Sequence, residues 1–238
     1  MSAFKNSQKL KAEARASLLG HLTTAVVSIF LYFAATSILA QTIAFTGNFP
    51  VFVSILLSAV VFIVVNICAN MLRIGLSDIF LKLHLQKGAK VGDILYAFRV
   101  SSDTAVKISA FRTLAELVFM LPVIIAINVI PAHGGTAYSV LIVALLVGGL
   151  IGVAFVRICF ALCPYLFLDF PELPAETIIK GGVKMIRGHK TRLLKLYLSF
   201  LPQYVLTLIS LGVAGFWVMS YSHAAAAAFY RDLTANLR

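Results

Sequence analysis

The chain has 238 residues, of which 61% are hydrophobic and only 12% are charged, and its mean hydropathy is +0.97. A soluble domain would have about a quarter of its residues charged. The composition therefore excludes a protein whose whole surface faces water, and it predicts an integral membrane protein.

Apolar segments long enough to cross a bilayer recur along the chain. A helix needs about 20 apolar residues to cross the hydrocarbon, and the last apolar stretch, 193–230, is too long for one crossing. It contains Pro202 and two glycines, so we predict that it turns tightly at Ser210 to Gly212 and crosses twice. The six predicted transmembrane segments are 22–46, 50–72, 111–130, 137–167, 193–211 and 213–230.

The basic residues lie on one side of these segments. Nineteen of the 20 Lys and Arg residues, all except Arg157, fall before the first segment, after the last one, or in and beside two connections, 73–107 and 169–192. Because cytoplasmic loops are enriched in Lys and Arg, we predict that both termini are cytoplasmic. The connections on the opposite side contain no basic residue: 46–50, 131–137 and 210–215.

Each pair of transmembrane segments follows a stretch with an amphipathic helical pattern. The first stretch is 1–21, and the other two are the elbows 73–107 and 169–192. The predicted fold class is therefore all-α: an integral membrane helical bundle of six transmembrane helices in three hairpins, with amphipathic interfacial helices on the cytoplasmic side. The whole chain, 1–238, is predicted to form a single membrane domain.

The most basic connection contains the stretch ETIIKGGVKMIRGHK. On a helix Lys180, Lys184 and Arg187 share one face, and the isoleucines face the other way. A phosphate-binding P-loop would need the pattern G-x-x-x-x-G-K-[ST] after a strand; here the glycine pair precedes V-K-M, no strand is predicted before it, and no Ser or Thr follows a Lys in that register. The candidates for contact with anionic lipid headgroups or an acidic partner are Lys180, Lys184, Arg187 and Lys190. The alternative is that these charges only orient the chain in the membrane.

Glu116 and Arg157 are the only charged residues deep within the predicted transmembrane segments. A charge at mid-bilayer costs about 3 kcal/mol, and the two depths agree to about one helical turn in an antiparallel hairpin. We therefore predict an intramembrane ion pair between these residues. The pair fixes the packing of the segments or, alternatively, takes part in a proton or ligand relay with Asn66, Asn70 and Arg112.

Two groups of small residues allow close helix packing. They are Gly148, Gly149 and Gly152, and the alanine run 224–228. We predict that both are internal packing seams, with an oligomer interface as the alternative.

Little in the sequence indicates catalysis. The five histidines are scattered, and neither H-E-x-x-H nor G-x-S-x-G occurs. Cys68, Cys159 and Cys163 lie in apolar segments without a C-x-x-C pair, so we predict neither a metal site nor a disulfide. We expect no enzyme activity, no cofactor and no nucleic-acid partner.

Four stretches carry a resemblance to a known family. They are KAEARASLLGH, RIGLSDIFLKL with the following GDILYAF, CPYLFLDFPELPAETIIKGGVKMIRGHK, and LSFLPQYVLTLISLGVAGFWVMSYSHAAAAAFYRDL. They resemble the bacterial membrane family known as domain of unknown function 975, whose usual P-G-I after the third span reads P-V-I at Pro122 to Ile124. The resemblance implies a multi-pass protein of the bacterial plasma membrane with no established activity. The chain is more distantly similar to the membrane region of some glycerophosphodiester phosphodiesterases, which implies a lipid-linked role.

These patterns favour a non-enzymatic scaffold or accessory protein. It would engage anionic lipid headgroups, a membrane-protein partner or a second copy of itself at the cytoplasmic face. The alternative is a small-molecule or lipid transporter or flippase with a polar intramembrane site near Glu116 and Arg157.

Overall fold

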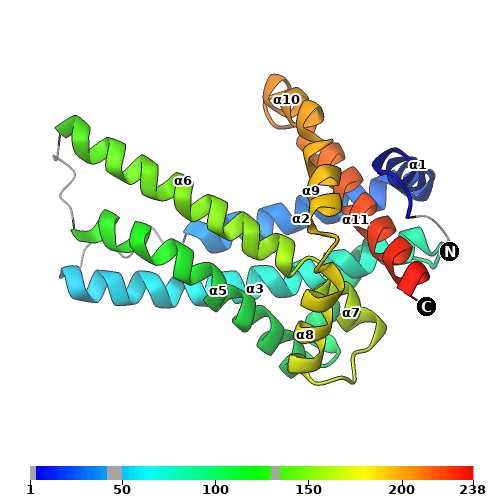
Figure 1. Ribbon diagram of the computed structural model, residues 1–238, viewed down its shortest axis with the longest axis horizontal. Coiled ribbons are helices and arrows are strands. Elements are labelled where there is room, and N and C mark those ends of the chain that lie inside the picture. The colour runs from blue at the N-terminus through cyan, green and yellow to red at the C-terminus, as the bar shows by residue number, and fades with distance from the viewer. Residues whose placement is uncertain (1–3, 42–49, 130–134, 238) are drawn as a thin grey trace.

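The computed structural model describes residues 4–41, 50–129 and 135–237, and within these ranges every regular element is helical (Figure 1). The predicted all-helical fold is therefore confirmed. The elements in chain order are α1 (Ser7–Leu18), α2 (Leu22–Gln41), α3 (Val51–His84), the 3-10 helix η2 (Val91–Leu95), α4 (Tyr96–Arg99), α5 (Ser102–Val129), α6 (Gly135–Cys159), α7 (Cys163–Asp169), α8 (Ala175–Ile186), α9 (Lys190–Leu198), α10 (Leu201–Ile209) and α11 (Gly215–Leu237).

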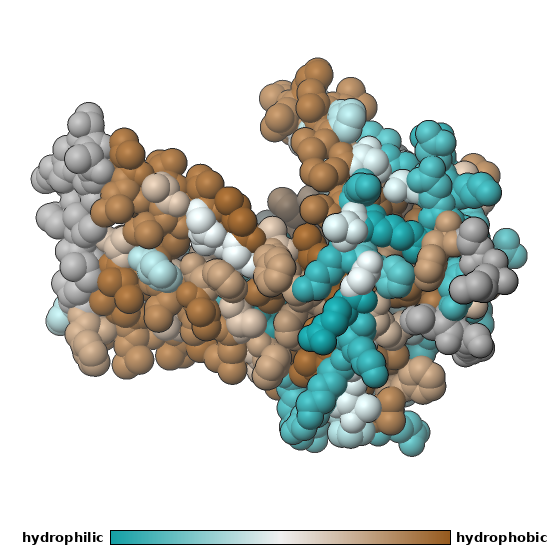
Figure 2. Space-filling view, in the orientation of Figure 1, coloured by the Kyte–Doolittle hydropathy of each residue, from teal (hydrophilic) through white to brown (hydrophobic). Residues whose placement is uncertain are grey.

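Apolar and hydrophilic surfaces gather at opposite ends of the molecule (Figure 2). At the apolar end, α2, α3, α5 and α6 expose many large hydrophobic side chains. We call the other end the head; it comprises α1, α3 from Leu72, η2, α4, α7, α8, α9 and α11 from Ala224. In the described parts of the chain, the segments long and apolar enough to cross a membrane are Leu22–Leu39, Phe52–His84, Ser102–Ile127 and Val140–Asp169.

Helix α3 continues without a break across the predicted boundary between 50–72 and 73–107. At 1.5 Å per residue its 34 residues extend about 51 Å, well beyond the roughly 30 Å of hydrocarbon. The prediction of a separate interfacial helix after residue 72 is therefore wrong. No proline interrupts residues 73–84, and the apolar stripe of this part is buried in the head, which favours a continued helix over a bend.

The 3-10 helix η2 folds back onto α3 and is held there by charge. The Lys82 Nζ lies 2.6 Å from an Asp78 carboxylate oxygen and 3.1 Å from an Asp93 oxygen, and the Lys90 backbone N–H donates to Asp93 at 3.0 Å. Burial opposes ionisation of Asp93, but the Lys90 N–H and the Lys82 ammonium outweigh it and lower the pKa of Asp93.

The C-terminal apolar stretch does not form two full crossings. Helix α9 ends at Leu198, and α10 begins at Leu201 with Pro202 in its first turn. The nine residues of α10 extend only about 14 Å. The prediction that 193–211 is one transmembrane helix is therefore wrong, because a proline has no N–H to continue the helix and starts a new one instead. The six predicted crossings are not confirmed.

Helix α10 and the first turns of α11 form a short hairpin. The tight turn predicted at 210–212 is present. Beyond it, Phe216 of α11 packs against Phe30 and Phe33 of α2, with ring centroids 5.6 and 6.4 Å apart. The predicted segment 213–230 therefore begins beside α2, which is long and apolar enough to cross a membrane, but its second half belongs to the head.

The predicted segment 137–167 is also divided. Helix α6 ends at Cys159, and α7 begins at Cys163. Pro164 lies in the first turn of α7, and it has no N–H to bond the carbonyl of Phe160, so the helix cannot continue regularly through this point.

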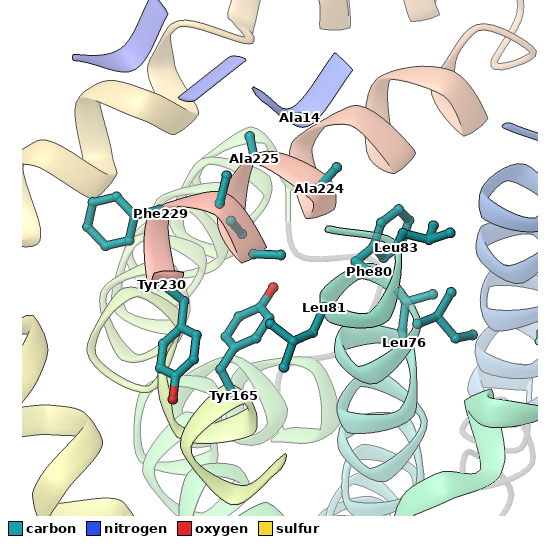
Figure 3. Packing of buried hydrophobic residues seen from close by; sticks show 14 of the residues in the cluster. Ala14, Leu76, Phe80, Leu81, Leu83, Tyr165, Ala224, Ala225, Phe229 and Tyr230 are labelled. Atoms are coloured by element: carbon teal, nitrogen blue, oxygen red, sulfur yellow. The ribbon is translucent and has the colours of Figure 1, made fainter. Parts of the chain in front are cut away.

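The core of the head is built around the alanine run 224–228 of α11 (Figure 3). All of these alanines are buried, and their small side chains let α1 and α3 approach α11 closely. Phe80 of α3 lies in the same core, and Tyr165 of α7 stacks on Tyr230 of α11 with ring centroids 5.2 Å apart. The predicted internal packing role of the alanine run is confirmed.

The apolar stripe of α1 is buried in the protein instead of in lipid. Leu10, Ala14 and Leu18 are buried in the core of the head, where α1 packs on α11 and α3. The predicted interfacial helix within 1–21 is therefore amphipathic, but its apolar face is already covered by the small-residue surface of α11.

The N-terminal segment is tied to the end of α11. Asp232, which is buried, pairs with Arg192 of α9 and accepts a bond from the Lys5 backbone N–H at 3.4 Å. Arg192 also donates to the carbonyl of Lys5 at 2.6 Å. The first and last described residues, 4 and 237, consequently lie at the same end of the molecule (Figure 1).

Candidate functional site

Glu116 lies on α5 with only 1% of its surface exposed, and two arginines contact it. Arg112, one turn earlier on α5, places its Nε 3.0 Å from Glu116 Oε1. Arg157 of α6 has its Nε 3.6 Å from the same oxygen. The structure thus brings Glu116 and Arg157 together, but Arg112 is the nearer partner.

Glycines allow α6 to pack closely on α5 beside this cluster. A Cβ on Gly152 would overlap the Phe119 ring, and a Cβ on Gly149 would lie 3.1 Å from the Phe119 carbonyl oxygen. A Cβ on Gly148 would meet nothing within 4 Å. The predicted packing seam is therefore confirmed for Gly149 and Gly152. It lets Arg157, about one and a half turns beyond Gly152, reach across to α5.

A cavity of about 190 Å³ opens beside the ion pair. Of the two asparagines predicted to join the site, Asn66 lines the cavity, whereas Asn70 donates to Thr113 Oγ1 at 3.1 Å. The volume is sufficient for several water molecules or a small anion, since water occupies about 30 Å³ per molecule in the liquid. The cavity is lined by Phe62, Asn66, Glu116, Met120, Leu150, Val153, Ala154 and Arg157.

Positive charge exceeds negative charge around Glu116. Arg73 of α3 lines a narrow hollow together with Arg112, and it forms no ion pair with any residue that the structure describes. The Nη2 of Arg112 is buried without a hydrogen-bond partner there. Two guanidinium groups therefore contact the one carboxylate and a third, that of Arg73, lies beside Arg112, so the region favours binding of an anion.

Helix α8 presents a separate basic surface. Lys180, Lys184 and Arg187 are exposed, and the isoleucines at 178 and 186 on the other side are buried. Among the described residues, the one ion pair of this surface joins Lys180 to Glu176 at 3.3 Å, with both side chains at least 80% exposed. We call Lys180, Lys184 and Arg187 the α8 surface.

Two of the four predicted basic candidates are placed differently than expected. Helix α8 ends at Ile186, so Arg187 follows the helix, and Gly188 with a φ of 94° turns the chain away. Lys190 begins α9, and its Nζ lies 4.8 Å from the ring centroid of Phe155 on α6. Lys190 is therefore not part of the elbow helix, because the left-handed glycine breaks the predicted helix before it.

The glycine pair of the elbow is explained by packing. A Cβ on Gly182 would lie 2.6 Å from the Cys163 Sγ and 3.2 Å from the Cys163 backbone. Gly182 therefore allows α8 to pack directly on the start of α7, which holds the α8 surface in a fixed position on the head.

Sequence reasoning missed two features of the Glu116 cluster. The spacing of four residues between Arg112 and Glu116 indicates a pair on one helix face, but the sequence alone gives Asn66 and Asn70 the same standing as Arg112. The sequence predicts Arg73 in an elbow, because the predicted second span ends at residue 72. Only the continuous α3 places it at the level of Arg112.

The described parts of the chain contain no gathering of three His, Cys, Asp or Glu side chains that could hold a metal ion. Cys159 and Cys163 are buried and Cys68 is half-buried, and all three are free thiols. The polar residues that do gather are arginines, one glutamate and amides, which suit anion binding better than metal binding.

Residues 1–237 match the model of a family described as "Protein of unknown function (DUF975)", and the chain therefore belongs to this family. Neither a curated protein nor a solved structure matches the chain. The distant similarity to glycerophosphodiester phosphodiesterases is accordingly not shown.

Proposed function

We propose that this member of the DUF975 family is a non-enzymatic accessory protein that engages anionic lipid headgroups at the cytoplasmic face of the bacterial plasma membrane. The observation that carries this proposal is the exposed and largely unpaired α8 surface on a packed head. Each basic residue near an anionic membrane surface contributes about 1 kcal/mol to the attraction.

The packing of α8 supports an electrostatic mode of engagement. Its apolar face is buried in the head through Ile178 and Ile186, so α8 is not free to turn over and insert into lipid. Contact with the membrane would then occur through the ends of Lys180 and Lys184, whose long side chains can extend towards headgroup phosphates.

The arrangement of the helices supports four complete crossings, by α2, α3, α5 and α6 with α7, and a short hairpin of α10 and α11 that enters the bilayer only partway. Four crossings leave the N-terminal segment and the end of α11 on one side. The excess of Lys and Arg at that end supports a cytoplasmic location for both termini.

The proposal is tested by measuring which lipids surround the protein. The full chain would be reconstituted in nanodiscs with equal phosphatidylglycerol and phosphatidylcholine, and the ratio of the two lipids that remain with it after release would be determined by mass spectrometry. The variant K180E/K184E/R187E is expected to lower the enrichment of phosphatidylglycerol roughly threefold or more.

The matched control is K9E/K87E/R99E, which reverses three exposed charges elsewhere in the head. It is expected to retain most of the enrichment. An equal loss of phosphatidylglycerol enrichment in both variants would show that only net charge matters. Unchanged enrichment in K180E/K184E/R187E would show that the α8 surface does not engage lipid. Either result contradicts the proposal.

A second candidate function, transport or flipping of a lipid or small molecule, is favoured by one observation, the cavity beside the buried Glu116. Proteoliposomes with fluorescent phospholipid in both leaflets distinguish the two functions. A flippase would expose the inner-leaflet label to an external quencher, and Glu116→Gln would slow this exposure. An accessory protein would leave the inner-leaflet label protected in both cases.

A further inference from the structure

Arg157 also borders a second and wider hollow, on another side of α6. This hollow has a volume of about 480 Å³, and side chains from α2, α3, α6, α9, α10 and α11 form its wall. Figure 2 shows a hollow between α6 and α10 with apolar surface on both sides. Three of the segments able to cross a membrane contribute to it, so in a membrane it would open towards lipid; we call it the lateral cleft.

Two arginines reach the lateral cleft from different helices. Arg73 comes from α3 and Arg157 from α6, and 53% of the Arg157 side chain is exposed. Arg157 shares Glu116 with Arg112, and Arg73 has no ion-pair partner in the described parts of the chain. The described lining contains no acidic side chain. A guanidinium group next to the bilayer is costly without a counter-charge, and Glu116 is shared between Arg157 and Arg112, so an anion in the cleft would stabilise Arg73 and Arg157.

The remaining polar groups of the cleft suit phosphate oxygens. Tyr197 and Tyr204 bring hydroxyl groups to the lining, and these hydroxyls can donate to phosphate. Arginine pairs with phosphate through two parallel N–H bonds, which gives both strength and orientation. A phosphate between Arg73 and Arg157 would balance the positive excess that Glu116 leaves uncompensated.

The exposed rim of the cleft is apolar or aromatic. Phe33 on α2 is 50% exposed and Tyr204 on α10 is 38% exposed. Further out, Phe30 of α2 and Leu201 and Val205 of α10 are also exposed. A soluble phosphate ion would leave these surfaces in contact with bulk lipid alone, whereas acyl chains attached to the phosphate would lie along them.

We propose that the lateral cleft binds the phosphate headgroup of an anionic membrane lipid. Arg73 and Arg157 pair with the phosphate, and the acyl chains lie against α2 and α10. Basic pockets between membrane helices are a known type of headgroup site. This inference rests on the proposed function, because it names the site where one lipid is held, in addition to the lipids attracted by the α8 surface.

The test is native mass spectrometry of the full chain released from nanodiscs of phosphatidylglycerol and phosphatidylcholine. The natural protein is expected to retain one phosphatidylglycerol molecule under activation that removes the other lipids. The variant R73Q/R157Q is expected to retain it about tenfold less often, and the control K87Q/R99Q, which removes two exposed charges of the head, is expected to match the natural protein.

A second variant separates loss of the site from misfolding. Thr36→Trp fills the lateral cleft from α2 but leaves both arginines and the Glu116 cluster in place, and it is also expected to lose the retained lipid. If either R73Q/R157Q or T36W retains the phosphatidylglycerol molecule as often as the natural protein does, the proposed site is wrong. Displacement of the lipid by millimolar inorganic phosphate would overturn its assignment to a lipid.

The cleft and the α8 surface can fail independently. The variant K180E/K184E/R187E is expected to keep the single retained lipid while losing the wider enrichment of phosphatidylglycerol. Loss of the retained lipid in that variant would assign it to the α8 surface and overturn the cleft. Suppose that the enrichment is unchanged in that variant and that the retained lipid still depends on Arg73 and Arg157. The α8 surface would then have no part in lipid engagement, and the proposal for the cleft would stand.

Discussion

Arg112 and Glu116 lie one turn apart on α5 and pair at 3.0 Å, while Arg157 reaches the same carboxylate oxygen from α6. The Glu116 carboxylate thus pairs with one arginine from its own helix and one from α6, in the apolar part of the molecule. Because Arg112 is almost fully buried and Arg157 is half exposed, the two arginines depend on Glu116 to different degrees.

Removal of the shared carboxylate is expected to be more harmful than removal of Arg157. Glu116→Gln leaves Arg112 buried without a counter-charge and should lower the free energy of unfolding by about 3 kcal/mol, whereas Arg157→Leu should cost about 1 kcal/mol because Glu116 keeps Arg112. SDS titration of the reconstituted protein measures both values. Glu172→Gln, at an exposed acidic position, is the control, and a larger effect of Arg157→Leu would contradict the geometry.

Gly75 is expected to be essential for the attachment of η2 to α3. A Cβ at this position would overlap the backbone carbonyl of Ile94, whereas a Cβ at Gly92, in η2 itself, would meet nothing within 4 Å. Gly75→Ala should therefore destabilise the head by about 1–3 kcal/mol and expose residues 91–99 to limited proteolysis. Gly92→Ala should leave the cleavage rate unchanged, and similar cleavage of the two variants would disprove this packing.

The attachment of η2 is expected to weaken in acid. Because folding lowers the pKa of Asp93, its interactions stabilise η2 fully above the unfolded pKa of about 3.9 and are lost as the pH falls through the lower folded pKa. Asp93→Asn should speed amide hydrogen exchange in η2 at pH 7, corresponding to about 0.5–1 kcal/mol. The difference between variant and natural protein should vanish at strongly acidic pH; a difference that persists there would have another cause.

The contact between Arg192 and Asp232 is expected to hold three parts of the head together. Asp232→Asn leaves Arg192 without its carboxylate and weakens the hold on Lys5, so it should cost about 3 kcal/mol. The same measurement on Arg231→Gln, at the neighbouring position, should show a change below about 0.5 kcal/mol. Equal effects would mean that charge at the end of α11 matters more than this contact.

The turn between α10 and α11 is expected to lie within the bilayer and not outside the cell. The nine-residue α10 is too short to cross the hydrocarbon, although Leu211 at its tip is 95% exposed in the protein itself. In a chain whose own cysteines are replaced, Leu211→Cys should resist a membrane-impermeant maleimide added from outside. Rapid labelling would restore two full crossings by 193–230.

Lys184→Cys tests the orientation in the same assay. This residue lies on the α8 surface, and it should react only after the membrane is permeabilised. Labelling of Lys184→Cys in intact cells would place the head outside and contradict the proposed cytoplasmic location.

Composition and periodicity identified the helical class and the four long apolar segments, because the need to satisfy every backbone group in lipid allows few alternatives. The same reasoning found Glu116 and Arg157, since a charge within an apolar stretch needs a partner. It failed at 193–230, where apolar composition is equally compatible with a crossing helix and with a helix buried in protein. Pro202 was the local sign that the stretch is divided.

The sequence by itself determined that the chain is helical, lies in a membrane and gathers its cations at one end, because these properties depend on hydrophobicity and charge summed over long segments. Only the tertiary structure decided that the amphipathic stripes of α1 and α3 pack on the alanine run of α11, and that Arg73 and Arg157 meet at one lateral cleft. Such contacts depend on which helices lie side by side. An apolar helix face has the same sequence pattern whether lipid or another helix covers it.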